Sequence, residues 1–117
     1  MNPNNGDIVL VGFPFTNLKQ VKVRPALVIS SDVVHKEEDD VTLLFISSVI
    51  PSDITKFELC FRKNHADFEK SGLKKDSLFK TNKIVTIQKK LIHRKLGTLG
   101  DTIRSELKKI FPIGIKI

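Results

Sequence analysis

The amino-acid sequence predicts a mainly β protein with helices (α+β), in which short strands form a compact barrel and one helix follows at the C-terminal end. Most apolar segments are too short for helices and are bounded by proline, glycine or polar loops. A longer apolar stripe with helical spacing occurs near the C-terminal end. A chain of 117 residues fits one hydrophobic core, so residues 1–117 are expected to form a single domain.

The first two strands are expected on either side of a polar loop. The β-branched run in "DIVLVGF" predicts a strand over residues 7–13, closed by Pro14. The segment "TNLKQVKV" then forms the loop. Pro25 lacks a backbone donor and suits a strand start better than a central position, so the second strand is predicted over about residues 26–31.

The middle of the chain predicts two strands and one helical turn. "DVVHKEEDD" contains four consecutive acids and is expected to be a solvated loop. "VTLLFISSVI" predicts a strand over residues 41–50, stopped by Pro51, and the alternation in "TKFELCF" predicts a half-buried strand over residues 55–61. "HADFEKSGL" holds one helical turn that Gly72 ends.

The last part of the chain is expected to end in a helix. "DSLFK" and "KIVTIQ" predict two strands separated by "TN", whereas "LIHRKLGTLG" is ambiguous. Asp101 is a suitable N-cap for the helix, which is predicted to end before Pro112. Its apolar stripe consists of Ile103, Leu107, Ile110 and Phe111.

The charge is distributed unevenly along the chain. The net charge is +7, yet residues 1–69 carry 7 Lys and Arg against 10 Asp and Glu, while residues 70–117 carry 13 against 3. A basic C-terminal part favours a polyanionic partner, either a nucleic acid or an acidic protein segment, and charge alone does not distinguish them.

The compartment is expected to be the cytoplasm, with no membrane association. Cys60 is the single cysteine, so no intrachain disulfide is possible. No apolar stretch approaches the roughly 20 residues that span a bilayer, and "MNPNNGD" lacks the features of a signal peptide.

The sequence predicts neither a metal site nor a cofactor. The histidines His35, His65 and His93 fall in separate segments without the spacing of metal ligands, and no glycine-rich phosphate loop is present. A pair of histidines can act as acid and base on RNA, but nothing in the spacing brings His65 and His93 together.

Arg24 in "VRPALVIS" is the most informative single residue. The following proline restricts it to extended geometry, which presents a permanent charge at the mouth of an apolar strand. Such an arginine either binds an anion or pairs with a carboxylate such as Asp7 or Asp32, and the residues alone leave both open.

Four stretches carry a family resemblance over nearly the whole chain: "GDIVLVGFPFT", "RPALVIS", "TLLFISSVI" and "LFKTNKIVTIQKKLIHRKLGTL". In order and spacing they resemble the MazF/PemK family of bacterial toxin endoribonucleases. The resemblance implies a CcdB-like, SH3-type barrel that forms a homodimer. It also implies metal-independent cleavage of single-stranded RNA, and inhibition by a cognate antitoxin whose acidic, disordered tail competes for the RNA groove.

The resemblance places the catalytic arginine on Arg24 and its partner hydroxyl on Ser47, where the family more usually has threonine. Ser48 is the alternative, and only one of the two faces the site because neighbouring strand residues point to opposite faces. The expected RNA-binding residues are Thr16, Asn17, Lys19, Lys22, Ser48 and Lys83.

The implied chemistry needs no metal, because the ribose 2′-hydroxyl attacks its own phosphate and leaves 2′,3′-cyclic phosphate and 5′-hydroxyl ends. A guanidinium stabilises the charge that develops on the phosphoryl oxygens, and with a pKa above about 12 it is a poor proton acceptor. The recognised RNA sequence is not readable from the residues.

Two other functions remain open for such a barrel. A CcdB-like toxin acts on a protein target, gyrase, through a tryptophan near its C-terminus, and this sequence contains no tryptophan. A non-catalytic RNA- or protein-binding barrel uses the arginine to hold a phosphate without cleavage. Replacement of Arg24 distinguishes the two, because it abolishes catalysis in an enzyme but only weakens affinity in a binding module.

Overall fold

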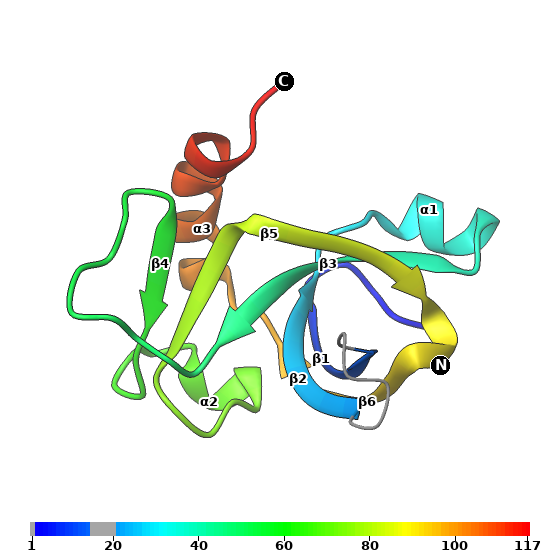
Figure 1. Cartoon of the computed structure of the whole chain (residues 1–117), viewed down its shortest axis with the longest axis horizontal. Helices are drawn as coiled ribbons and strands as arrows, with labels where there is room; N and C mark the ends of the chain where they lie inside the picture. Colours follow the sequence, from blue (N-terminus) through cyan, green and yellow to red (C-terminus); the bar gives the residue numbers. More distant parts are fainter. Residues whose placement is uncertain (1, 15–20) are drawn as a thin grey trace.

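The computed structural model describes residues 2–14 and 21–117 and shows a six-stranded antiparallel sheet in the order β4-β5-β3-β2-β1-β6. The sheet curls into a barrel-like shape, with α3 standing beside β4 at one end and α1 at the other (Figure 1). This arrangement confirms the predicted mainly β fold with a C-terminal helix. The strands are β1 Asp7–Pro14, β2 Val21–Val28, β3 Asp40–Ser47, β4 Glu58–Phe61, β5 Ser77–Gln88 and β6 Ile92–Thr98. The helices are α1 Asp32–Glu37, α2 Phe68–Ser71, α3 Asp101–Gly114 and the 3₁₀ turn η1 Lys89–Leu91.

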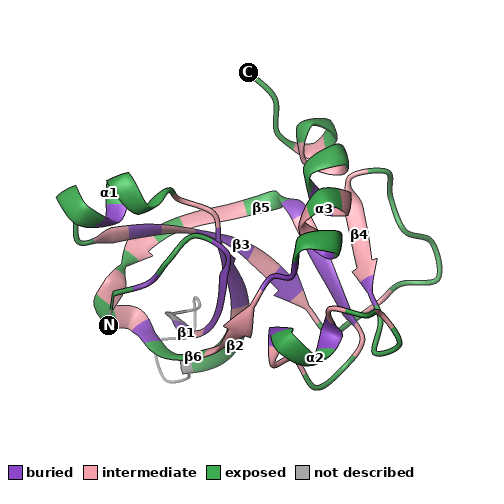
Figure 2. Ribbon diagram, turned by 180° about the vertical axis from the view of Figure 1, so that it is seen from behind, coloured by how far each residue is buried: buried purple, intermediate pink, exposed green. Residues whose placement is uncertain are grey.

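Each face of the sheet carries its own apolar core, because successive side chains of a strand point to opposite faces. We call the side of Val9, Val11, Ala26 and Val28 the inner face, which forms the barrel interior. The outer face carries Ile8, Leu27, Leu44, Ile46 and Phe79, which pack with Phe61, Phe68, Leu99, Ile103 and Leu107 from the elements around α3. Buried positions accordingly run along the strands and along one side of α3 (Figure 2).

Strand β2 differs from its prediction, because it begins at Val21 and ends at Val28. Pro25 therefore lies inside the strand. Residues 21–27 of β2 pair with β1, but only residues 26–28 pair with β3. Pro25 is tolerated because β2 has a hydrogen-bonding neighbour on one side only at that residue.

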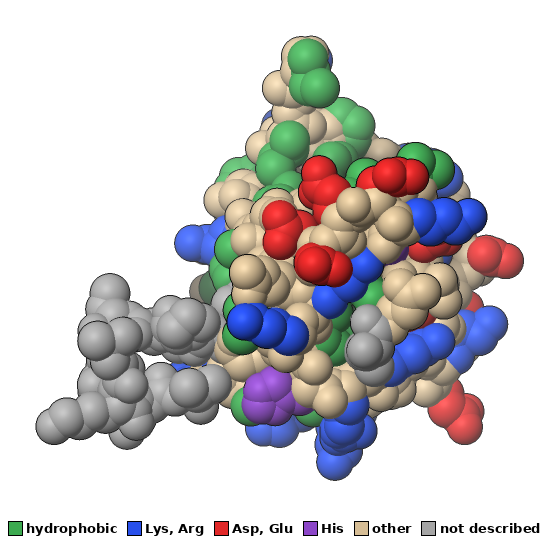
Figure 3. All heavy atoms as spheres, turned by 90° about the vertical axis from the view of Figure 1, so that its right-hand side faces the viewer, with side chains coloured by type: hydrophobic (Ala, Val, Ile, Leu, Met, Phe, Trp, Pro, Cys, Tyr) green, Lys and Arg blue, Asp and Glu red, His purple; other side chains and the backbone are tan. Residues whose placement is uncertain are grey.

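Helix α1 occupies part of the predicted loop over residues 32–40, so that prediction was wrong. His35 is the buried residue of α1, and its Nε2 lies 2.5 Å from the Ser30 hydroxyl. The Lys89 ammonium donates a hydrogen bond to the His35 carbonyl at 2.5 Å. These tertiary contacts stabilise a helix too short to form alone. The acids that follow are exposed, and Figure 3 shows acidic and basic side chains intermingled on the face that carries α1.

Strand β5 is one strand where two were predicted. Its pairing with β3 shifts between Leu44↔Ile84 and Phe45↔Lys80, which leaves residues 81–83 as a bulge. The first part of β5 also pairs with β4, so the strand joins the barrel to the elements beside α3. The predicted strand limits were too wide for β3 and β4, and the ambiguous residues 91–100 contain β6.

The helical predictions near the C-terminal end are correct in place and differ in detail. Helix α2 ends at Gly72, which has the left-handed φ of 72° that favours glycine. Helix α3 continues through Pro112 to Gly114. Asp67, and not Asp101, supplies the side-chain cap of α3, because its Oδ2 accepts the Ile103 N–H at 2.9 Å. Within the described part of the chain, no helix is long and apolar enough to cross a membrane.

Candidate active site

Arg24 lies on the inner face, near the end of the barrel. It pairs with Val11 of β1 and shares the alternation of Ala26 and Val28, yet its own side chain is exposed. Among residues 2–14 and 21–117, no carboxylate lies within ion-pair distance of its guanidinium. Its charge is therefore available to an anion from solution.

The carboxylates considered as partners of Arg24 are engaged elsewhere. Asp7 accepts the Asn4 N–H at 2.9 Å and lies 3.3 Å from the Lys95 ammonium. Asp32 accepts the Asn5 N–H at 2.8 Å. The structure thus argues against the explanation of Arg24 as half of a surface ion pair.

Ser47 is on the same inner face as Arg24. The β2–β3 ladder ends at Ala26↔Phe45, and Arg24 and Ser47 each follow that last pair by two residues, so both lie on the side of the sheet that carries Ala26 and Phe45. The half-buried Ser47 hydroxyl accepts the Val49 N–H at 3.1 Å. Its own proton has only a long contact of 3.4 Å to the Val49 carbonyl, so this proton can be redirected to a ligand.

Ser48 lies on the other side of the sheet. It is exposed and lines a pocket together with Pro25 and Leu10, both of which point to the outer face. Ser47 and Ser48 therefore serve different surfaces. Of the two hydroxyls, that of Ser47 shares a face with Arg24.

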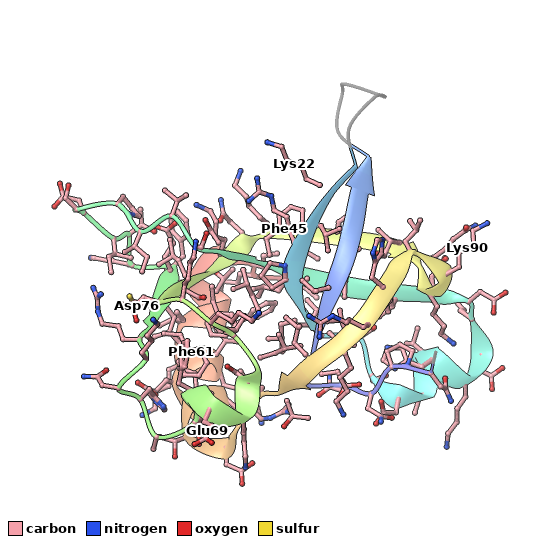
Figure 4. The ribbon with its side chains drawn as sticks, turned by 90° about the horizontal axis from the view of Figure 1, so that it is seen from below. Lys22, Phe45, Phe61, Glu69, Asp76 and Lys90 are labelled. Carbon is pink, nitrogen blue, oxygen red and sulfur yellow. The ribbon has the colours of Figure 1, made fainter. Side chains whose placement is uncertain are left out.

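The remaining RNA-binding candidates are only partly grouped with Arg24. Lys22 is exposed, follows the same alternation, and lies beside the outer end of the β1–β2 hairpin, on the side on which Phe45 is also drawn (Figure 4). Lys83 is exposed in the β5 bulge, and no contact with another described residue ties it to Arg24 or Ser47. Thr16, Asn17 and Lys19 lie outside the described residues.

The histidines do not form an acid–base pair. His65 donates to Glu106 at 2.8 Å and accepts the Asp67 N–H at 3.0 Å, which ties the loop before α2 to α3. His93 is exposed on β6. In the described ranges, no three His, Cys, Asp or Glu side chains are grouped so that they could hold a metal ion.

A basic pocket on the outer face is a feature that the sequence prediction missed. It has a volume of about 240 Å³ and is lined by Leu10, Pro25, Ser48, Gly72, Leu73, Lys74, Lys75, Ser77, Arg94 and Leu96. The cations come from the basic part of the chain, residues 70–117. The charge asymmetry was thus a signal for it, but it did not specify which of the basic residues gather.

The fold is similar to that of solved toxin structures. Mycobacterium tuberculosis toxin MazF-mt6 superimposes with a TM-score of 0.72 at 18% identity, covering 92% of this chain and 94% of that one. A MazE-MazF structure from Deinococcus radiodurans gives 0.74 at 15% identity, with 97% and 95% covered. An endoribonuclease in complex with its cognate antitoxin, from a mycobacterial species, gives 0.73 at 12% identity, with 96% and 93% covered.

The sequence itself is diverged from characterised relatives. No curated protein sequence matches the chain significantly. A family model, however, matches residues 4–113, which is most of the chain, including the two strands that carry Arg24 and Ser47. This protein belongs to the family of PemK-like, MazF-like toxins of type II toxin–antitoxin systems.

Proposed function

We propose that this protein is a sequence-specific, metal-independent endoribonuclease that cuts single-stranded RNA and is inhibited by a cognate antitoxin. The observation that carries the proposal is the exposed Arg24, which has no carboxylate partner among the described residues and lies on the same inner face as the Ser47 hydroxyl. Membership of the toxin family supports it, as does the similarity in fold to a protein described as an endoribonuclease.

The reaction that suits these groups is an internal transfer of the phosphate. The ribose 2′-oxygen forms a bond to phosphorus while the bond to the 5′-oxygen breaks, so a 2′,3′-cyclic phosphate and a 5′-hydroxyl result. The 2′-proton leaves to solvent and the departing 5′-oxygen takes up a proton. RNA supplies its own nucleophile, so DNA is not a substrate.

Arg24 stabilises the negative charge that develops on the phosphoryl oxygens. Its planar guanidinium can donate two parallel hydrogen bonds to the phosphoryl oxygens, which a lysine cannot reproduce. The half-buried Ser47 hydroxyl adds a neutral donor on the same face of the sheet. A preorganised donor such as the Arg24 guanidinium typically contributes a factor of about 10²–10³ in kcat.

The same unpaired charge explains inhibition by an acidic partner. Lys22 and Arg24 are exposed on one side of the β1–β2 hairpin, and an acidic antitoxin segment that neutralises them would exclude RNA. We also propose that the protein is a homodimer in the cytoplasm. Light scattering of the purified protein tests whether it is a homodimer. Measurement of RNA binding by the antitoxin-bound protein tests whether antitoxin and RNA compete.

The decisive experiment uses end-labelled, mixed-sequence single-stranded RNA in excess EDTA. Wild-type protein should give discrete fragments with cyclic phosphate and 5′-hydroxyl ends, and Arg24→Ala should give none. Arg62→Ala is the matched control, because Arg62 is also an exposed arginine but contacts Asp76 at 3.4 Å. It should cut like the wild type.

Three results would contradict the proposal. RNA that is bound but left intact by the folded wild type indicates a non-catalytic binding barrel. A protein that neither binds nor cuts RNA points to a protein target. Equal cleavage by Arg24→Ala removes Arg24 from the active site.

A further inference from the structure

The outer-face pocket lies directly behind the proposed active site. Pro25 follows Arg24 in β2 and Ser48 follows Ser47 after β3, and both Pro25 and Ser48 line the pocket. Consecutive Cα atoms are about 3.8 Å apart, so the pocket begins one residue away from each proposed catalytic side chain. A strand of RNA held at Arg24 has this pocket next to it, around the end of the sheet.

The floor of the pocket is apolar, and Arg94 stands at its edge. Leu10 of β1 pairs with Pro25 of β2 on one side and with Arg94 of β6 on the other. Leu96 and Leu73 complete the apolar lining. This surface offers the face of a nucleobase or a ribose a contact that excludes water.

The segment before Lys74 and Lys75 packs closely against β6 because two glycines allow the backbones to approach. A side chain at Gly72 would meet the Leu96 carbonyl oxygen at 2.0 Å, and Gly72 has a φ of 72°. A side chain at Gly97 would meet the Lys70 carbonyl oxygen at 2.2 Å. Because backbone approaches backbone this closely, the wall of the pocket is preformed before any ligand binds.

The rim of the pocket carries three cations whose charge is not neutralised. Lys74, Lys75 and Arg94 are exposed, and no carboxylate of the described residues lies within ion-pair distance of them. The nearby Asp76 is engaged elsewhere, because it contacts Arg62 at 3.4 Å and accepts the Lys63 N–H at 2.7 Å. The rim therefore attracts a group with negative charge.

From these observations we infer that the outer-face pocket binds the nucleotide that flanks the cleaved one, with its base on the apolar floor and its phosphate on Lys74, Lys75 and Arg94. The exposed Ser48 hydroxyl at the edge of the pocket can read the base by a hydrogen bond. This inference rests on the proposed function. It makes the pocket a determinant of the RNA sequence that is cut.

The test compares Arg94→Ala/Lys75→Ala with the control Lys108→Ala/Lys109→Ala, which removes two exposed cations from α3. A short RNA with one cleavage site gives kcat and KM, and a copy with a 2′-deoxy sugar at the cleaved nucleotide gives Kd without cleavage. The pocket variant should raise KM and Kd about tenfold and leave kcat within about twofold. The slope of log K against log salt should also fall by about 0.7 for each phosphate that the variant no longer neutralises. Thermal unfolding verifies that both variants are folded.

Ser48→Ala tests the specificity directly. Sequencing of the cleaved ends from a mixed RNA pool should show a relaxed base preference at one position beside the cut. Cleavage at the preferred site should itself persist. An unchanged preference at every position would remove Ser48 from base recognition.

The outcomes separate this inference from the proposed function. If the pocket variant binds and cuts RNA as the wild type does while Arg24→Ala is inactive, the assignment of the pocket is wrong and the proposed endoribonuclease function is supported. If the pocket variant retains RNA binding but loses an acidic antitoxin peptide, the pocket is a peptide site and the inference is overturned. If the wild type does not cut RNA, the Kd for the 2′-deoxy copy still decides, because only a nucleotide site loses affinity in the pocket variant.

Discussion

The cations of this protein fall into two groups that differ in their partners. Around β4 and α3, basic groups have carboxylates close by: Lys80 lies 3.0 Å from Glu58, and His65 lies 2.8 Å from Glu106. At the end of β2 and around the outer-face pocket, Arg24 and the rim cations are exposed and have no such partner among the described residues. The first group holds elements together, and the second leaves positive charge for a ligand.

This difference gives the proposed functional surface a position, which the count of charges does not. A net charge of +7 indicates a polyanionic partner but gives no position. The pairing pattern gives one, because a cation that stabilises the fold is expected to keep a carboxylate neighbour. Variants of the unpaired group should therefore lower activity, and variants of the paired group should lower stability.

The largest expected effect is on catalysis, from Arg24→Lys. Lysine keeps the positive charge but loses the planar fork, so kcat should fall about 100-fold. The free energy of unfolding should not change, since Arg24 has no partner to lose among the described residues. Steady-state cleavage and urea unfolding measure the two quantities. A variant that cuts at the wild-type rate shows that charge alone is sufficient, and a destabilised variant moves Arg24 into the paired group.

The opposite effect is expected from Glu58→Gln in the paired group. The Glu58 carboxylate accepts hydrogen bonds from the Lys80 ammonium at 3.0 Å and from the Thr55 hydroxyl at 2.7 Å, and its side chain is only 6% exposed. Loss of its charge should lower the free energy of unfolding by about 1–3 kcal/mol and leave cleavage unchanged.

Glu69→Gln is the matched control for this variant, because Glu69 is exposed on α2 (Figure 4). Urea unfolding should show no change for it. An equal loss of stability in both variants would mean that the Glu58 contacts contribute nothing specific.

A smaller effect on catalysis is expected from Ser47→Ala. Removal of one neutral donor should lower kcat about tenfold with little change in KM, because the hydroxyl acts on the transition state. Ser47→Thr keeps the hydroxyl and restricts its rotamers, so it should retain activity. Single-turnover cleavage distinguishes the two. If Ser47→Ala is fully active, the hydroxyl has no part in the reaction.

The smallest expected effect is on how the free energy of unfolding depends on pH in the acid range. Hydrogen bonds from the Thr55 side chain and backbone, and then the contact with Lys80, lower the pKa of Glu58 from 4.5 to about 2. A lowered pKa stabilises the folded state above pH 4.5, and this contribution is lost as the pH falls toward 2. The difference in unfolding free energy between wild type and Glu58→Gln should therefore shrink between pH 6 and pH 3, as about one group is protonated. A difference that is constant with pH would contradict this account.

Local patterns in the sequence were sufficient for the strands and the terminal helix. The β-branched run of β1 and the spacing of Ile103 and Leu107 in α3 are decided by nearby residues. Features that depend on distant partners were not predictable. Pro25 is tolerated because the pairing of β2 with β3 ends at Ala26, and the bulge at residues 81–83 follows from the pairing of β5 with β3.

The candidate site divides in the same way. The motif around Arg24 is contiguous, so it was recognisable in the sequence. The alternation of side chains at the end of β3 predicted that Ser47 and Ser48 point to opposite faces. The outer-face pocket takes side chains from β1, β2, β6 and the segment before β5. No pattern along the chain connects these positions, because only the order of strands in the sheet brings them together.

Strand β5 has a consequence for how the molecule unfolds. Its first residues are hydrogen-bonded to β4 on one side and β3 on the other, and its last residues pair with β3. Loss of the first part of β5 therefore breaks the pairing with both of its neighbouring strands. We therefore expect one cooperative transition, with the amide protons on both sides of the bulge exchanging at the rate of global unfolding.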